Sequence, residues 1–190
     1  MRIFKQFILG LLFIFAFATI YATTIPHWKI ISDKSTLNFT ATQNGAPVNG
    51  EFKKFDGEIK FDPAQLNSSQ IKITVDMNSV SSSYAQVADT LKTADWFNVK
   101  SYPKAVFKAS HFVKTGNNSY QASGNFTLRD KTVPITLNFV LDEYSATQSR
   151  VHGDTTIKRT AFGVGQGEWA NTNTIKDDVQ IHFTLSATAS

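Results

Sequence analysis

The segment Val133-Pro134-Ile135-Thr136-Leu137-Asn138-Phe139-Val140-Leu141 decides the fold, because apolar side chains occupy every second position along it. A period of two is typical of a β-strand with one face in a core and the other in water. The same alternation runs from Tyr120 to Leu128, and Arg129-Asp130-Lys131-Thr132 between the two segments predicts a hairpin turn. The two segments are therefore expected to be neighbouring antiparallel strands.

Alternating segments recur along the rest of the chain. They lie near residues 36–41, 52–61, 71–77, 105–109, 151–157 and 179–187. Together with the two segments of the preceding paragraph, these six predict eight antiparallel strands, each with one face exposed to solvent. Asp56-Gly57 is expected to interrupt the second of these strands with a bulge or turn. One short helix is expected from Ser83 to Lys92, with an N-cap from one of the serines 81–83.

The expected fold is all-β, because eight such strands leave two open edges unless the sheet closes into an up-and-down barrel or a curled sandwich. An eight-stranded interior is either filled by its own side chains or holds one small ligand. The large side chains expected to point inward are Phe39, Phe52, Phe61, Ile73, Val75, Phe107, Phe126, Leu137, Phe139, Ile181 and Phe183. Small residues such as Ala41, Ala122 and Gly124 alternate with them, and this mixture fits a packed core and a slot equally well.

Residues 1–22 have the three parts of a secretory signal peptide. Arg2 and Lys5 precede an apolar run, and small residues surround Ala22, after which we expect cleavage. The apolar run from Phe7 to Tyr21 is shorter than the about 20 residues of a membrane-spanning helix, although an uncleaved anchor is the alternative. A single exported domain is thus expected over residues 23–190. The chain has no Cys and so uses no disulfides, and among the compartments that an exported protein reaches we favour a bacterial periplasm.

Composition excludes several function classes. A chain without Cys has no disulfide, no Cys-based zinc site and no thiol nucleophile. Removal of Arg2 and Lys5 from the 19 basic residues leaves 17 against 15 acidic ones, too small an excess for a nucleic-acid surface. The four histidines are isolated in sequence and the G-x-S-x-G elbow is missing. No catalytic residue, metal or cofactor is therefore predicted, and an enzyme built from histidines that converge in space is the alternative.

The order and spacing of several motifs resemble the YceI-like proteins. The motifs are Trp28-Lys29-Ile30, Ser35-Thr36-Leu37-Asn38-Phe39, Gly50-Glu51-Phe52, Phe61-Asp62-Pro63, Asp95-Trp96-Phe97, Tyr102-Pro103-Lys104-Ala105-Val106-Phe107, Gly124-Asn125-Phe126-Thr127-Leu128-Arg129 and Phe162-Gly163-Val164-Gly165. The resemblance covers nearly all of residues 28–187 and implies a lipocalin-like antiparallel barrel. It also implies that the interior binds an isoprenoid lipid of the quinone or polyprenyl-phosphate type, without catalytic residues or a cofactor.

Two groups of residues are candidates for a gate or for contact with a lipid headgroup. Trp96 and Phe97 follow the expected helix and are expected either to gate one end of the barrel or to cap it. Arg159, Gln166 and Trp169 carry side chains that suit a phosphate or quinone oxygen, and the alternative for Arg159 is an ion pair at the surface or between loops.

The segment from Gly163 to Trp169 resembles a branch of YceI-like proteins associated with membrane cytochromes of the b561 type. A soluble partner of such a cytochrome is therefore an alternative function, compatible with lipid binding. The sequence leaves the choice between monomer and homodimer open.

Overall fold

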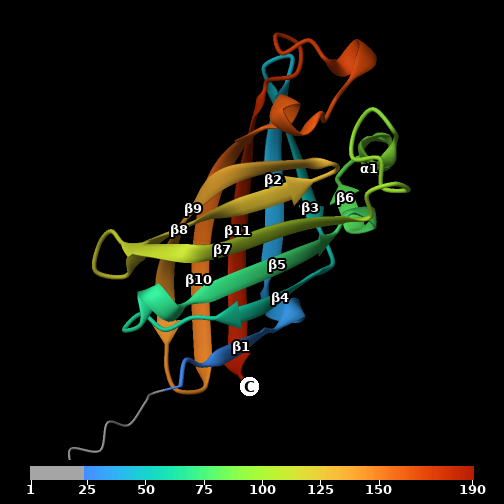
Figure 1. Ribbon diagram of the computed structural model, residues 1–190. Helices are drawn as coiled ribbons and strands as arrows, with labels where there is room; N and C mark the ends of the chain where they lie inside the picture. The colour runs from blue at the N-terminus through green and yellow to red at the C-terminus, as the bar shows by residue number, and fades with distance from the viewer. Residues whose placement is uncertain (1–23) are drawn as a thin grey trace, which may run out of the picture.

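The computed structural model describes residues 24–190, and the expected signal peptide lies outside them. Eleven strands form one antiparallel sheet that closes on itself where β1 pairs with β11, Trp28 opposite Ala189 and Ile30 opposite Ala187 (Figure 1). The strands are β1 (His27–Ile30), β2 (Thr36–Gln43), β3 (Ala46–Phe52), β4 (Phe55–Lys60), β5 (Gln70–Asp76), β6 (Val80–Ser82), β7 (Lys104–Lys114), β8 (Ser119–Leu128), β9 (Lys131–Tyr144), β10 (Gln148–Lys158) and β11 (Asp178–Ala189).

The eleven strands amount to eight long ones, because three of these are each broken once. β1 and β2 lie end to end along β11, which pairs with β1 through residues 187–189 and with β2 through residues 180–184. In the same way β3 leads into β4, and β5 leads into β6. The breaks are the 3₁₀ helix η1 (Ser32–Lys34), the pair Lys53-Lys54, and the 3₁₀ helix η3 (Met77–Ser79). The prediction of a closed eight-stranded antiparallel barrel with one helix is confirmed.

The expected interruption at Asp56-Gly57 is wrong. Gly57 lies inside β4, opposite Ile73, and the strand breaks earlier, at Lys53-Lys54. Gly57 is required by packing in the interior and not by a turn. A Cβ at this position would lie 2.7 Å from Ile73 Cδ1 and 3.0 Å from Ile30 Cδ1. The glycine therefore makes room for two inward isoleucines.

The single α-helix, α1 (Ala85–Lys92), packs at one end of the barrel. Its N-cap is Tyr84, whose side chain makes no capping hydrogen bond, so the expected serine cap is wrong. Ser82 is the last residue of β6 instead, and its hydroxyl donates to the carbonyl of Asn49 at 2.9 Å. The buried Leu91 anchors the helix on the core. Among residues 24–190, no helix is both long enough and apolar enough to cross a membrane.

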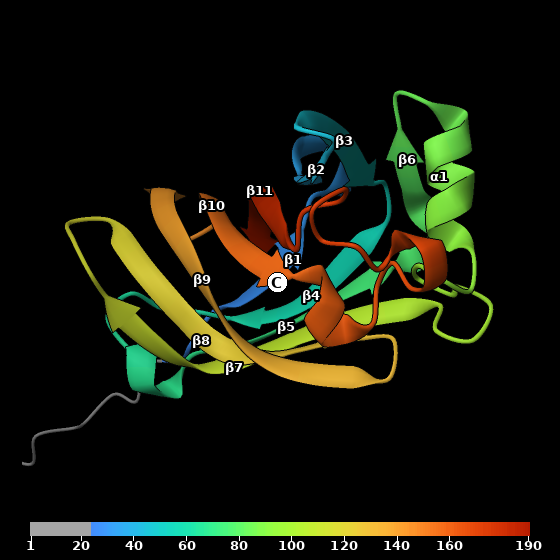
Figure 2. The ribbon, with the colours of Figure 1, turned by 90° about the horizontal axis from the view of Figure 1, so that it is seen from above.

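The two ends of the barrel are closed differently. At the end that carries α1, the loops of residues 93–103 and 159–177 cover the opening (Figure 2), and we call this the plug end. Buried Met77, Phe97 and Phe162 belong to the core cluster there. A second cluster at the opposite end contains Trp28, Phe61, Phe107, Phe112, Tyr120 and Phe139, and we call this the aromatic end.

Candidate functional site

A cavity of about 240 Å³ lies inside the barrel, between the two core clusters. Residues of both ends line it, from Trp28 and Phe112 to Trp96 and Val164, so it is a slot that runs lengthwise through the barrel. All eleven side chains predicted to point inward line this slot: Phe39, Phe52, Phe61, Ile73, Val75, Phe107, Phe126, Leu137, Phe139, Ile181 and Phe183. The alternating pattern thus surrounds open space rather than a filled core.

The wall of the slot is almost entirely apolar. Apart from its tryptophans, the residues with polar side chains that line it are Asn38, Ser149, Thr155 and Arg159. The hydroxyl of Thr155 donates to the carbonyl of Thr136 at 2.9 Å, so that polar group is satisfied within the wall. A surface of this kind excludes water and favours a hydrocarbon.

The aromatic end is closed by rings and by continuous strand pairing. Phe61 packs against Phe112, Tyr120 and Phe139 with ring centroids 5.6, 5.8 and 5.7 Å away. Trp28 donates its indole N–H to the carbonyl of Phe61 at 2.9 Å. β1 pairs with β4 on one side and with β11 on the other, so the backbone of the wall is complete there.

At the plug end the wall is not continuous. β9 and β10 pair from Tyr144 opposite Ser149 to Asn138 opposite Asp154, and no further. Beyond that point β9 pairs with β8 alone and β10 with β11 alone. The 3₁₀ helix η4 (Arg159–Phe162) follows β10, and the buried Phe162 ring packs on Phe126 at 5.3 Å. Closure at this end therefore depends on loop residues.

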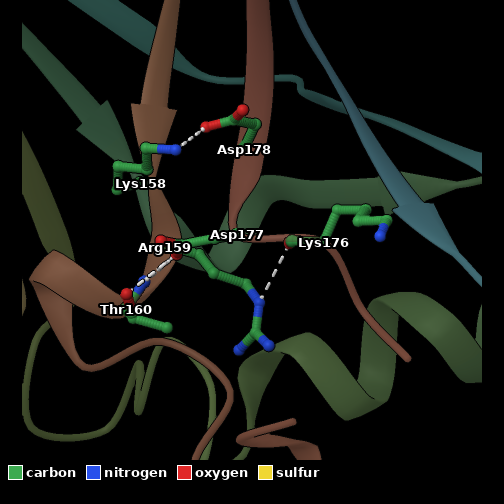
Figure 3. A network of polar contacts seen from close by, with 6 residues as sticks. All are labelled: Lys158, Arg159, Thr160, Lys176, Asp177 and Asp178. Atoms are coloured by element: carbon green, nitrogen blue, oxygen red, sulfur yellow. Dashed lines mark hydrogen bonds and ion pairs between the residues drawn. The ribbon is translucent and has the colours of Figure 1, made fainter. Parts of the chain in front are cut away.

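Arg159 holds the loop of the plug end together. Arg159 is 2% exposed, and Figure 3 shows its Nε directed at the carbonyl of Lys176, 3.2 Å away. The other donors are also used: Nη1 donates to Val164 and Gly165, and Nη2 donates to Trp169 and Ile175, at 2.9 to 3.0 Å. Burial lowers the pKa of Arg159 from its usual value, and Asp177 opposes that shift.

Asp177 anchors the other side of the same loop. Its carboxylate accepts hydrogen bonds from the backbone N–H of Thr160 at 3.0 Å and from the Thr160 hydroxyl at 2.8 Å (Figure 3). Burial raises the pKa of Asp177, but the two bonds from Thr160 and the charges of Lys158 and Arg159 outweigh it, and the pKa lies below its ordinary value. The ion pair of Lys158 with Asp178 lies beside it on the exposed surface.

The structure places the gate candidates Trp96 and Phe97 in the wall of the slot. Both are 9% exposed and both line the cavity. The carbonyl of Trp96 accepts a hydrogen bond from Arg129 Nη1, which also donates to the carbonyl of Gly163 at 2.7 Å. The sequence places Arg129 in a hairpin turn and at the end of a family motif. Nothing in the neighbouring residues indicates that its side chain joins two distant loops.

The remaining headgroup candidates differ in whether they line the cavity. Arg159 lines the cavity, but all its donors are occupied by carbonyls of its own loop rather than by an ion pair. Gln166 is exposed and donates its side-chain N–H to the carbonyl of Gly163 at 2.7 Å. Trp169 packs against the ring of Trp96 at 5.7 Å, outside the cavity lining. The contacts of these side chains with a headgroup stay predictions.

The four histidines lie on exposed positions of separate strands. His152 Nδ1 is 2.8 Å from the carboxylate of Asp142, and this exposed pair lies between neighbouring strands β9 and β10. Within residues 24–190, no three Asp, Glu or His side chains lie close enough together to hold a metal ion.

Comparison with known proteins gives relatives in sequence and in structure. A UPF0312 protein of Vibrio cholerae is 30% identical over 136 residues, which cover 68% of this chain and 72% of that protein. A UPF0312 protein of Pseudomonas aeruginosa is 31% identical over 120 residues, which cover 60% of this chain and 62% of that protein.

Solved structures share the fold. BcnA of Burkholderia cenocepacia superposes with a TM-score of 0.79 at 34% identity, over 84% of this chain and 99% of that one. A polyisoprenoid-binding domain from Saccharophagus degradans superposes with a TM-score of 0.70 at 16% identity, over 87% of this chain and 99% of that one. The sequence model of the YceI-like domain matches residues 28–187, and the chain therefore belongs to the YceI-like family.

Proposed function

We propose that the barrel binds the hydrocarbon chain of a long isoprenoid lipid in its interior. The observation that carries this proposal is the apolar slot of about 240 Å³, which extends between the two ends of the barrel and has few polar side chains in its wall. A slot that runs between the two ends of a barrel suits a chain better than a compact ring system. Binding rather than catalysis is the activity that such a wall supports.

Burial of the chain supplies the affinity. At about 0.8 kcal/mol per CH₂-sized group, each five-carbon unit contributes on the order of 4 kcal/mol before ordering costs. Several units therefore outweigh any single polar contact of a headgroup. The description of the Saccharophagus degradans neighbour as a polyisoprenoid-binding domain supports the same ligand class for this barrel.

The finer parts of the proposal concern the lipid and its location. We propose a quinone or a polyprenyl phosphate as the ligand, carried by a protein that is exported to the periplasm with removal of residues 1–22. N-terminal sequencing of protein recovered from the periplasm tests export, with Thr23 expected as the first residue. An intact N-terminus in the membrane fraction contradicts removal of residues 1–22.

A partnership with a membrane cytochrome of the b561 type is a second proposal. It is favoured by exposure of Gln166, Gly167 and Glu168 at the tip of the plug end, within the segment that resembles the cytochrome-associated branch. Recovery of a haem protein with the purified chain from detergent extracts supports this partnership. The same preparation, sized by light scattering, distinguishes a monomer from a homodimer.

Organic extraction of the purified protein followed by mass spectrometry tests lipid binding. A co-purifying isoprenoid in about one copy per chain is expected. Ala41 lines the slot and Thr40 precedes it on the other face of β2, so Ala41→Phe and Thr40→Phe form a matched pair. Ala41→Phe should lower the recovered lipid while Thr40→Phe retains it. Extracts without lipid, together with failure of the stripped protein to bind added isoprenoids, contradict the function.

A further inference from the structure

Two side-chain donors are buried without an acceptor, and both belong to the plug end. Across residues 24–190 the buried side-chain N and O atoms that lack a hydrogen-bond partner are Trp96 Nε1 and Arg129 Nε. The two residues are joined, because Arg129 Nη1 donates to the carbonyl of Trp96. A buried N–H without an acceptor is unfavourable and rare in native proteins, so this pair requires an explanation.

The tryptophan at the other end of the slot provides the contrast. Trp28 also lines the cavity and is also buried, but its indole N–H donates to the carbonyl of Phe61 at 2.9 Å. The fold is therefore able to satisfy an indole in the wall of this slot. The unpaired N–H is a property of the plug end alone.

Backbone carbonyls of the loops at the plug end accept hydrogen bonds from other donors. Arg129 takes the carbonyls of Trp96 and Gly163, and the backbone N–H groups of Gly165 and Gln166 share the carbonyl of Asp95. Arg159 takes the carbonyls of residues 164, 165, 169, 175 and 176. These carbonyls accept from other groups, and none of them accepts from Trp96 Nε1.

Two arginines, the buried Arg159 and the half-buried Arg129, lie at the same end. In the part of the chain that the structure describes, neither Arg129 nor Arg159 has a carboxylate oxygen within 4.0 Å, since the ion pairs present join other residues. An unpartnered indole N–H in the wall of an apolar slot, with two guanidinium groups at the same end, complements an oxygen that accepts hydrogen bonds.

We propose that the oxygen-bearing headgroup of the bound isoprenoid lies at the plug end and accepts a hydrogen bond from Trp96 Nε1, while the tail points toward the aromatic end. This inference rests on the proposed function and adds the orientation and chemical class of the ligand. A quinone carbonyl and a phosphate oxygen share the required chemistry. Trp96 Nε1 has less than 1 Å² of accessible area, so the ring shifts within the wall to admit the oxygen.

Three probes separate the contributions of tail and headgroup in protein stripped of lipid. They are squalene, which is an isoprenoid hydrocarbon without oxygen, a ubiquinone, and a polyprenyl phosphate of similar chain length. Trp96→Phe should weaken binding of the oxygen-bearing probes by roughly threefold to tenfold and change squalene binding by less than about twofold. The larger of the two losses identifies whether a carbonyl or a phosphate is the better acceptor.

Trp28→Phe is the matched control, because it removes an indole from the same slot at the other end. It should alter the affinities for all three probes by a similar factor and leave their ratios unchanged. An equal loss for squalene in Trp96→Phe, or no loss for either oxygen-bearing probe, overturns the inference. Failure of the unsubstituted protein to bind any probe contradicts the proposed function instead.

A measurement on the unsubstituted protein avoids any folding defect of the variants. The indole N–H resonance of Trp96 is assigned in ¹⁵N-labelled protein by its loss in Trp96→Phe. It should move downfield when the ubiquinone or the phosphate is added, and move little with squalene, because only an acceptor oxygen forms the hydrogen bond. An indole resonance that responds equally to all three probes contradicts the proposed contact.

Discussion

Arg159 is a buried cation that stabilises a loop through backbone carbonyls instead of through a carboxylate. Its donors reach residues up to 17 positions away, from Val164 to Lys176. A loop without regular secondary structure has many carbonyls that need donors, and one guanidinium presents five in a fixed geometry. The residue therefore shapes one end of the slot.

Replacement of Arg159 by Gln should lower the free energy of unfolding by about 3 kcal/mol or more, because several buried carbonyls lose their donors. Lys158→Gln is the control, since the neighbouring Lys158 makes only an exposed ion pair with Asp178, and little change is expected. Urea unfolding curves of the two variants measure the difference. Equal stability of the two variants is the result that contradicts this role.

Asp177 gives the plug end a dependence on pH. Its pKa in the folded protein lies below the ordinary value of about 3.9, so its stabilisation is complete above that value and is lost as the pH falls through the lower folded pKa. Asp177→Asn should therefore be less stable than the unsubstituted protein above about pH 5, and the difference should shrink as the pH falls below about 3.9. Thermal unfolding across this range measures it, and a constant difference contradicts the assignment.

Among the elements, β9 and β10 form a part of the wall in which the strand pairing stops before the plug end. Their ladder ends at Asn138 opposite Asp154, and η4 fills the divergence with Phe162. The register shifts between Arg150 and Val151, where β9 carries one extra residue, Asp142, and a bulge of this kind bends the strand that carries it. The barrel thus opens toward the plug end although β10 continues along β11.

Hydrogen exchange should reveal this divergence. The amides of β9 between Val133 and Leu137 that point away from β8 have no ladder partner in β10 and should exchange faster than amides paired with β10 between Asn138 and Tyr144. β10 amides between Thr155 and Lys158 that point to β11 serve as the internal control and should stay protected. Uniform protection along β9 contradicts the open ladder.

At the scale of the whole molecule, an empty apolar slot lowers the stability of the folded state, and a bound ligand restores it. Unfilled space deprives the lining side chains of contacts, and a ligand that binds only the folded state adds stability by mass action. The two core clusters lie on either side of the slot, so a bound chain contacts both.

Removal of the bound lipid should therefore lower the melting temperature. Restoring the ligand to about 100 times its Kd contributes about 2.7 kcal/mol, or roughly 5 to 11 °C for a domain of this size. Differential scanning calorimetry before and after organic extraction measures the shift, and Ala41→Phe, which occupies part of the slot, should show a smaller one. An unchanged melting temperature on adding the lipid contradicts a ligand that spans the barrel.

The sequence by itself determined the number of strands, the face that each presents to the interior, and the single helix. The period of two in segments such as Val133 to Leu141 is a local property, because alternate side chains of a strand must lie on opposite faces. The eleven inward side chains and the hairpin turn at Arg129 follow from it. The family resemblance rested likewise on motifs that are read along the chain.

Only the tertiary structure decided whether the barrel is filled, where its strands break, and what Arg129, Arg159 and Trp96 contact. The space along the axis depends on how far side chains from opposite walls reach, which no single strand specifies. The partners of these three residues come from loops and turns far apart in sequence, such as Trp96 and Arg129. A hydrogen bond across the fold, or the lack of one, depends on positions in space that local sequence patterns do not contain.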